Sequence, residues 1–304
     1  MCLLVIVSAA IVIFTIMYFV PGDPVKIMLG DSATVEMVQE MREKLGLNDP
    51  YLVQLGRFLY NAFIKFDLGI SYTYNQPITN ELLNRLPRTL MIGIACILMD
   101  VIISIPMGIY AALKQGKWQD RVSMIIAMIT VSVPDFWFAL LLVMLFSSKL
   151  NWLPSFGIGT PAHYVMPILA GGLAGIGGMA RQTRSGMLDV MRSDFVTTAR
   201  AKGVSERKVI TKHMLPNALI PVVTVIGGHF GRAVAGTVVI EQIFTIPGIG
   251  TYMLNAVNSR DYPVVRGSVI ILAIITSLVM LAVDLVYALI DPRIKAQYSG
   301  KAGQ

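Results

Sequence analysis

Three charged residues lie inside long apolar stretches of the sequence, where a charge is unfavourable. Asp100, Asp135 and Arg232 each have mostly apolar neighbours for many positions on both sides. A charge at the centre of a membrane helix costs about 2.5 to 3.5 kcal/mol on insertion scales, so such residues usually face a bundle interior or a water-filled path. They could bind a solute that carries both charges, or an aspartate could simply neutralise the arginine. The neutral pair is the preferred interpretation.

Other residues that could do chemistry are few. Cys2 and Cys96 both lie in apolar stretches, which argues against a disulfide framework or a thiolate metal site. His163 and His229 have no partner at metal-ligand spacing, so we expect no metal site. The sequence has no Gly-x-x-x-x-Gly-Lys-Ser/Thr loop to hold phosphates, so we expect that the chain itself neither binds nor hydrolyses ATP. We expect no catalytic residue and no cofactor.

The composition indicates an all-α membrane protein. Of 304 residues, 55% are hydrophobic and only 14% are charged, and the net charge of +7 has to be judged by where the basic residues lie. We expect no nucleic-acid partner. A membrane helix needs about 20 mostly apolar residues, and six segments meet or approach that length. They are Cys2–Val20, Thr89–Leu113, Val122–Phe146, Tyr164–Ala180, Ala218–Ile240 and Gly267–Ile290.

Basic residues in the short loops predict the orientation of these spans. Lys114–Arg121 carries three, Arg181–Asn217 carries eight and the tail after Ile290 carries three, whereas Ser147–His163 carries one and Glu241–Arg266 carries two. The positive-inside rule places the two lysine- and arginine-rich loops and the tail in the cytoplasm, and with six spans both termini lie there too.

The same orientation divides the chain into parts. We expect a first span at 1–20, an extracytoplasmic helical insertion at 21–88, and a transmembrane core of spans two to six at 89–304 that includes a cytoplasmic loop at 181–217. Within the insertion, short helices are expected at Thr34–Leu45 and Tyr51–Phe66. Leu52, Leu55, Phe58 and Leu59 should lie on one side of the second.

Glycine spacing and prolines indicate how the spans pack. Gly171 and Gly175, and likewise Gly227 and Gly231, are four residues apart, a spacing that lets membrane helices approach closely. We expect packing rather than ligand contact there. Pro106, Pro134 and Pro221 could kink their spans.

The large cytoplasmic loop contains a basic stretch, AKGVSERKVITKHMLPNAL. Ser193 to Lys202 has helix-compatible residues, Gly203 permits a left-handed turn, and Ser205 can cap a second helix that runs to about Met214, before Pro216. One interpretation is a helix pair that rests on anionic lipid through its basic side chains. These are Arg200, Lys202, Arg207 and Lys208.

The spacing of this stretch resembles the EAA loop of ABC importer permeases. That pattern is Glu-Ala-Ala, three residues, Gly, nine residues, then an apolar residue and Leu-Pro, and here Ala199, Gly203 and Pro216 match it. Thr197 and Thr198 stand in place of the Glu and first Ala, and His213 in place of the apolar residue. With these departures, the loop resembles those of the peptide and nickel branch of the family, in which the Glu is commonly absent.

Four more stretches resemble the same branch in the expected order. They are PGDP at Pro21–Pro24, EQIFTIPGIG at Glu241–Gly250, RDYPVVRG at Arg260–Gly267 and DLVYALIDPRIK at Asp284–Lys295. Together they resemble the first of the two permease subunits of dipeptide, oligopeptide or nickel importers.

The resemblance implies a set of partners and a coupling role for the loop. The partners are a second, homologous permease, two cytosolic ATP-binding subunits that carry ATP and magnesium, and an extracytoplasmic binding protein. The loop would dock on an ATP-binding subunit through matching positions. These are Ala199, Lys202, Gly203, Val204, Arg207, His213, Leu215, Pro216 and Asn217.

Two alternatives stay open at this point. The same architecture could import nickel or a metal chelate, because that branch shares the loop. An ion-coupled secondary transporter could use Asp100, Asp135 and Arg232 as coupling groups, although the sequence lacks the internal repeats expected of that class. We expect a bacterial or archaeal inner-membrane location.

Overall fold

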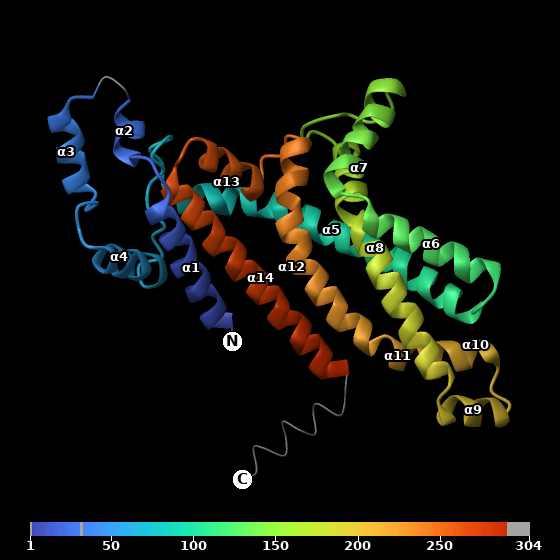
Figure 1. The fold of residues 1–304 in the computed structure, drawn as a ribbon. Helices are drawn as coiled ribbons and strands as arrows, with labels where there is room; N and C mark the ends of the chain where they lie inside the picture. The colour runs from blue at the N-terminus through green and yellow to red at the C-terminus, as the bar shows by residue number, and fades with distance from the viewer. Residues whose placement is uncertain (1, 31–32, 291–304) are drawn as a thin grey trace, which may run out of the picture. The chain divides into compact units, whose positions relative to one another are not determined.

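The structure is a computed structural model that describes residues 2–30 and 33–290, without the side chains of 27, 224, 232–236, 284 and 286–290. The described elements are all helical, apart from one isolated bridge between Ile70 and Pro77 (Figure 1). The α-helices are α1 (Cys2–Phe19), α2 (Pro24–Leu29), α3 (Val35–Lys44), α4 (Tyr51–Phe63), α5 (Ile78–Leu113), α6 (Trp118–Ser132), α7 (Asp135–Leu142), α8 (Ala162–Met191), α9 (Asp194–Ala201), α10 (Glu206–Lys208), α11 (Leu215–Ala218), α12 (Ile220–Ile243), α13 (Ile249–Asn258) and α14 (Tyr262–Ile290). Two π-helices, η1 (Val143–Lys149) and η2 (Val209–Met214), complete the described elements.

The expected all-α membrane fold is confirmed. Among the described residues, four helices are long and apolar enough to cross a membrane, and the number rises to six if each of two bent helix pairs is one span. The four are α1, α5, α8 and the part of α14 from Tyr262 to Val283.

Two of these helices are longer than the apolar pattern predicts. The second predicted span starts at Thr89, but α5 starts at Ile78, and the fourth ends at Ala180, but α8 continues to Met191. The added turns of α8 contain Arg184, whose charge is paired with Asp120 on α6. Pairing lets a charged turn continue the helix beyond the apolar segment.

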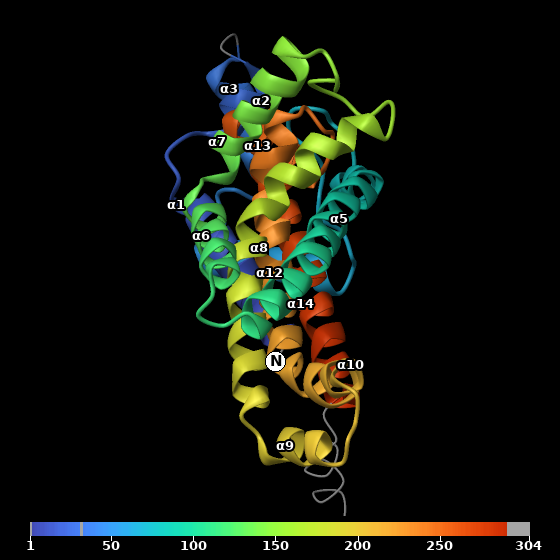
Figure 2. The same cartoon turned by 90° about the vertical axis from the view of Figure 1, so that its right-hand side faces the viewer.

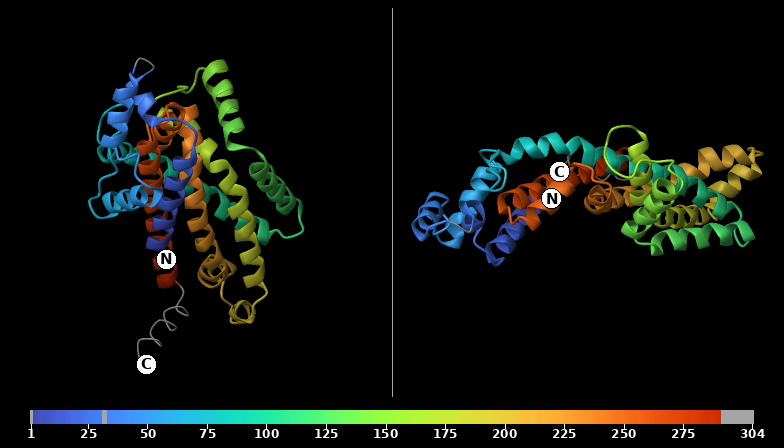
Figure 3. Two further views of the ribbon diagram at one scale, coloured as in Figure 1. Left: turned by 60° about the vertical axis from the view of Figure 1, so that its left-hand side comes forward. Right: turned by 90° about the horizontal axis from the view of Figure 1, so that it is seen from above.

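The third predicted span, Val122–Phe146, is broken rather than continuous. α6 ends at Ser132, and α7 begins at Asp135 after a bend of 97° (Figure 3). Pro134 explains the break, because a proline disfavours helical backbone in the residue before it, and Val133 is extended with ψ 122°. The expected kink at Pro134 is confirmed, and its size exceeds that of a kinked single helix.

The chain divides into two compact units, Met1–Thr89 with Ile246–Ser277 and Leu90–Thr245 with Leu278–Gln304. In the first unit, α1 packs against α4. Its core contains two clusters of buried residues, namely Ile78, Leu82, Ile249, Tyr252, Ala256, Val264 and Val265, and Ala10, Ala62 and Ile270. The sequence predicts a loop where α13 lies. That helix follows Gly248 and buries Ile249, Tyr252 and Ala256 on one side.

The short helices at 24–63 start and stop at residues suited to those positions. The PGDP stretch begins α2, because Asp23 accepts a hydrogen bond from Val25 N and Pro24 occupies the first turn. Thr34 caps α3 in the same way. Helices at Thr34–Leu45 and Tyr51–Phe66 were expected, and α3 and α4 confirm them to within a few residues. Leu52 is 75% exposed, so it does not share the covered side of α4.

In the second unit, α8 is the central helix, and α6, α7 and α12 pack against it. Glycines on α8 allow close approach, because a Cβ added at Gly171 would lie 2.9 Å from Cys96 Sγ, and one at Gly177 2.1 Å from Ala127 O. Gly227 of α12 faces Val283 of α14 in the same way. Packing roles for Gly171 and Gly227 are thus confirmed.

Candidate functional site

The loop after α8 forms a helix, a tight turn and a second helix (Figure 2). Ser193 occupies the N-cap of α9, and Lys202 is its C-cap. Gly203 follows with φ +73°, and nothing lies within 4 Å of where its Cβ would be. The left-handed turn predicted at Gly203 is therefore confirmed, and backbone conformation rather than lack of space requires glycine there.

An ion pair spans this turn. Arg200 Nε lies 3.1 Å from Glu206 Oε2, and Arg200 Nη2 lies 2.6 Å from Glu206 Oε1. The hydrogen bond to Glu206 raises the pKa of Arg200, which stays charged at any physiological pH. Both side chains are well exposed, so solvent screening leaves the pair with little stabilising effect.

The second half of the loop differs from the prediction in its helix type. Ser205 takes the N-cap position of α10 but makes no side-chain capping bond. The helix then runs as η2 through Val209–Met214 and as α11 to Ala218, so it passes Pro216 instead of ending before it. Pro216 lacks an N–H, so one helical hydrogen bond upstream is missing, and local π-helical bonding is a known adjustment. The bend of 46° comes after Ala218.

Apolar residues on one side of the loop pack against the ends of α8 and α5. The buried residues of this cluster are Ala112, Met187, Val196, Ala199, Val209, Met214 and Ala218. Val204 and Leu215 pack against this cluster while partly exposed. Of the predicted loop residues, Ala199, Val204 and Leu215 therefore hold the loop in place.

The other predicted loop residues are exposed or partly exposed at the surface. Lys202, Gly203, Arg207, Pro216 and Asn217 are exposed, and His213 is partly exposed. Asn217 Nδ2 donates to His213 O at 2.8 Å, which fixes the two side by side. These are the members of the predicted set that a partner could contact.

Sequence reasoning missed Phe195, a large apolar residue on the open side of α9. Its side chain is 44% exposed, while its neighbour Val196 is fully buried. Val196 and Ala199 are three residues apart and define the buried face of α9, so Phe195 lies off that face. The helical period alone could have identified it.

The predicted charges inside the spans have different surroundings. Asp100 on α5 is 4% exposed, and His229 on α12 lies with Nδ1 4.0 Å from Asp100 Oδ2. The Asp100 side chain fits over α8 because Gly175 has no Cβ; one placed there would lie 1.7 Å from Asp100 Oδ2. Asp100 Oδ1 is buried without a hydrogen-bond partner among the described atoms. His229, for which the sequence shows no partner at metal-ligand spacing, thus faces an aspartate.

Asp135 and Arg232 complete the predicted set. Asp135 is the first residue of α7, directly after the break at Pro134, rather than the middle of a continuous helix. Its charge is close enough to act on Asp100, and its Oδ1 is also buried without a described partner. The Arg232 side chain lies outside the described residues, as do Asp284 and the DPRIK end of the last matched stretch.

The described residues contain no group of three or more His, Cys, Asp or Glu that could hold a metal ion.

Comparison with known families decides the class. The model of the binding-protein-dependent transport system inner membrane component matches residues 104–296, and the N-terminal model of the same membrane component matches 1–93. The chain belongs to this family. It is a multi-pass protein of the bacterial inner membrane and an ABC transporter permease, which implies ATPase and binding-protein partners. Members are non-catalytic and carry no cofactor, since partner ATPases hydrolyse ATP.

Individual proteins are similar over nearly the whole chain. The dipeptide transport system permease protein DppB of Alkalihalophilus pseudofirmus is 39% identical over 319 aligned residues, which cover 96% of each chain. The glutathione transport system permease protein GsiC of Escherichia coli K12 is 38% identical over 286 residues, 94% of this chain and 93% of that protein.

A solved structure shares the fold. A chain of the inward-facing MetNI methionine ABC transporter matches with a TM-score of 0.59 at 17% identity, covering 69% of this chain and 96% of that one. Membership in the permease family removes the ion-coupled secondary transporter as an alternative.

Proposed function

We propose that this chain passes di- or oligopeptides from an extracytoplasmic binding protein into the cytoplasm, as the first of two permeases in an ATP-driven importer. The observation that carries the proposal is the identity of 38 to 39% to relatives named for dipeptide and glutathione transport, over more than nine tenths of the chain. Glutathione is a tripeptide, so both names concern short peptides.

We place the loop at 181–217 in the cytoplasm, together with both termini, and the insertion at 21–88 outside. The eight basic residues of Arg181–Asn217 support this orientation. The loop then faces the ATP-binding subunits. Its exposed residues include the aromatic Phe195 and the basic Arg200, Lys202 and Arg207, a composition suited to a pocket with an acidic rim.

The coupling role follows from how the loop is held. Its apolar side packs on α8 and α5, so a push on α9 or on the turn at Gly203 is transmitted to membrane helices rather than absorbed by a free loop. ATP binding would close the two ATP-binding subunits and thereby move the loops of both permeases.

We assign Asp100, Asp135 and Arg232 to the substrate path, and add His229 because it faces Asp100. Among the described atoms, Asp100 Oδ1 and Asp135 Oδ1 are buried without a hydrogen-bond partner, which supports this assignment, since a buried carboxylate without a donor is costly unless a donor is supplied to it. The charged amino group of a peptide has the complementary chemistry.

Uptake by the assembled importer in proteoliposomes tests the substrate class. Radiolabelled dialanine and radioactive nickel would be offered in parallel, each with its candidate binding protein and ATP. We expect ATP-dependent dipeptide uptake and background nickel uptake. Nickel uptake without peptide uptake would assign the chain to the metal-importing alternative.

A further inference from the structure

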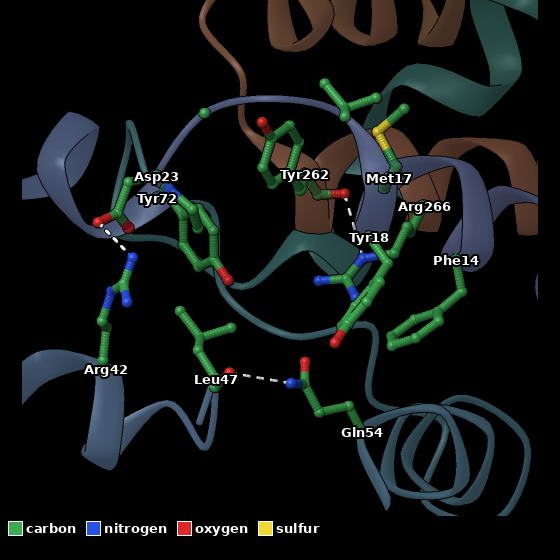
Figure 4. Close-up of a pocket in the computed structure, with 13 residues that line it drawn as sticks. Phe14, Met17, Tyr18, Asp23, Arg42, Leu47, Gln54, Tyr72, Tyr262 and Arg266 are labelled. Carbon is green, nitrogen blue, oxygen red and sulfur yellow. Dashed lines mark hydrogen bonds and ion pairs between the residues drawn. The ribbon is translucent and has the colours of Figure 1, made fainter. Parts of the chain in front are cut away.

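A cavity of about 330 Å³ lies in the first unit, between the end of α1 and the start of α14 (Figure 4). Met17 and Tyr18 line it from α1, Leu47 and Gln54 from the segment that includes α4, and Tyr72 and Arg266 from the other side. None of these residues has a role in the coupling loop or the charge cluster of the second unit.

Arg266 supplies the positive charge of this cavity. Figure 4 shows its guanidinium pointing into the space near Tyr18 and Tyr72. The guanidinium carbon lies 5.2 Å from the ring centres of both Phe14 and Phe58, so aromatic faces hold it. Nε donates a long hydrogen bond of 3.4 Å to Tyr262 O.

The acidic groups around the cavity are already engaged. Asp23 pairs with Arg42 at 2.8 Å. Asp261 is close enough to act on Arg266, but its carboxylate accepts hydrogen bonds from Ser71 Oγ and from two backbone amides, those of residues 72 and 73. Among the described residues, Arg266 forms no ion pair with a carboxylate. Arg266 is hydrogen-bonded to the hydroxyl of Tyr72, so its guanidinium has a polar neighbour but no paired carboxylate, and an anion in the cavity would complete the pairing.

The cavity also offers neutral donors at the same place. Burial raises the pKa of Tyr72, so its phenol keeps its proton at physiological pH. The hydroxyl of Tyr262, another lining residue, is buried without a hydrogen-bond partner among the described atoms. An oxyanion could accept from these groups and from the guanidinium together.

The position of the cavity indicates which anion reaches it. Its lining residues include the last turns of α1 and the first turn of α14, which are the ends of two membrane-spanning helices. Tyr18 and Phe19 at the end of α1 are 44% and 73% exposed, as expected for aromatic residues at a membrane–water interface. Phospholipid phosphates lie at this depth.

We propose that the cavity binds the phosphate headgroup of an anionic phospholipid, with the Arg266 guanidinium as its main partner. Arg binds phosphate through two parallel hydrogen bonds, and the apolar side chains of Met17 and Leu47 suit the first carbons of the lipid's acyl chains. A bound lipid would fasten α1 to α14. The alternative occupant with related chemistry is the carboxylate of a short peptide, and the test separates the two.

The test uses the full-length chain, delipidated in mild detergent. Native mass spectrometry would count bound dioleoyl-phosphatidylglycerol, and the shift in thermal unfolding midpoint would be recorded with the same lipid. Dioleoyl-phosphatidylcholine, inorganic phosphate and dialanine serve as comparison ligands. We expect binding and stabilisation by phosphatidylglycerol well above the other three, and about a tenfold or greater loss of that binding in Arg266→Gln.

Arg260→Gln is the matched control, because Arg260 is an exposed arginine nearby that does not line this cavity. It should bind the lipid as the unchanged protein does. If Arg266→Gln fails to fold, Arg266→Lys and Tyr72→Phe replace it, and each should weaken lipid binding by several fold. Equal lipid binding in the Arg266 and Arg260 variants would overturn the proposal. So would stronger stabilisation by dialanine than by phosphatidylglycerol.

Discussion

Arg184 on α8 holds Asp120 on α6 through two parallel hydrogen bonds, Nε to Oδ1 at 2.6 Å and Nη2 to Oδ2 at 2.7 Å. The side chain of Asp120 is only 7% exposed, and its Oδ2 also accepts from Gly116 N at 3.0 Å. One carboxylate thus ties the α5–α6 turn to the turn of α8 that leads into the coupling loop.

Removing this carboxylate should destabilise the protein measurably. We expect Asp120→Asn to lower the free energy of unfolding by about 2 kcal/mol, because it leaves a partly buried guanidinium without its partner. The measurement is denaturant unfolding in detergent. Asp49→Asn is the control, because Asp49 pairs with Arg57 where both side chains are exposed, and it should cost less than about 1 kcal/mol. Equal losses of unfolding free energy in the two variants would show that the Asp120–Arg184 pair stabilises the protein no more than an exposed ion pair does.

The fit of Asp100 over Gly175 makes a packing prediction. Gly175→Ala should lower the unfolding midpoint, with a cost of about 1 to 3 kcal/mol, because the added Cβ would overlap the carboxylate of Asp100. Gly228→Ala on α12 is the matched control, since nothing lies within 4 Å of its added Cβ. Thermal unfolding in detergent compares the two. An undisturbed Gly175→Ala variant would contradict the position of the Asp100 carboxylate against Gly175.

Phe195 should be the main apolar anchor of the ATP-binding subunit. Its truncation to alanine should reduce the ATPase recovered with the purified permease by about tenfold or more, as expected for a central aromatic contact. Phe195→Leu keeps most of the apolar surface and should retain most of the complex. Quantitative co-purification measures both. Unchanged recovery with the alanine variant would remove Phe195 from the interface.

Asp100 should distinguish peptides by their amino group. Asp100→Asn is nearly isosteric, so the variant should be inserted in normal amounts. If the carboxylate binds a peptide ammonium, uptake of free dialanine should fall by about tenfold or more, whereas N-acetylated dialanine should be affected little. Uptake of both peptides into proteoliposomes decides this. A parallel loss for both would indicate a structural role for Asp100 beside His229.

The sequence predicts much of this fold because apolar length and turn residues act locally. Gly203 has the left-handed backbone expected of it, and Thr34 caps its helix where the pattern places it. The features that the sequence does not predict depend on contacts between residues that are distant along the chain. The extra turns of α8 contain Arg184, which pairs with Asp120 on α6, and the hydropathy of a sequence window does not report such a pair.

For the candidate site too, the sequence predicts the local features and not the contacts between distant residues. The extent of the loop follows from its motif, but whether Ala199 is buried or Lys202 is exposed depends on how the loop packs against α8. The contact between Asp100 and His229 joins residues from two spans, and no spacing in one sequence reveals such a contact.

The most direct test concerns Gly203, whose φ of +73° is the reason that glycine is needed in the turn between α9 and α10. A β-branched residue there strains the turn by about 1 to 2 kcal/mol. Gly116 has φ +76° and equally open surroundings, but lies in a different loop, so Gly116→Val has matched strain without the coupling role. ATP-driven dialanine uptake would be measured in proteoliposomes that contain the assembled transporter. We predict that Gly203→Val loses at least about nine tenths of uptake while Gly116→Val keeps most of it. Equal uptake by the two variants would contradict the proposal that this loop couples ATP hydrolysis to transport.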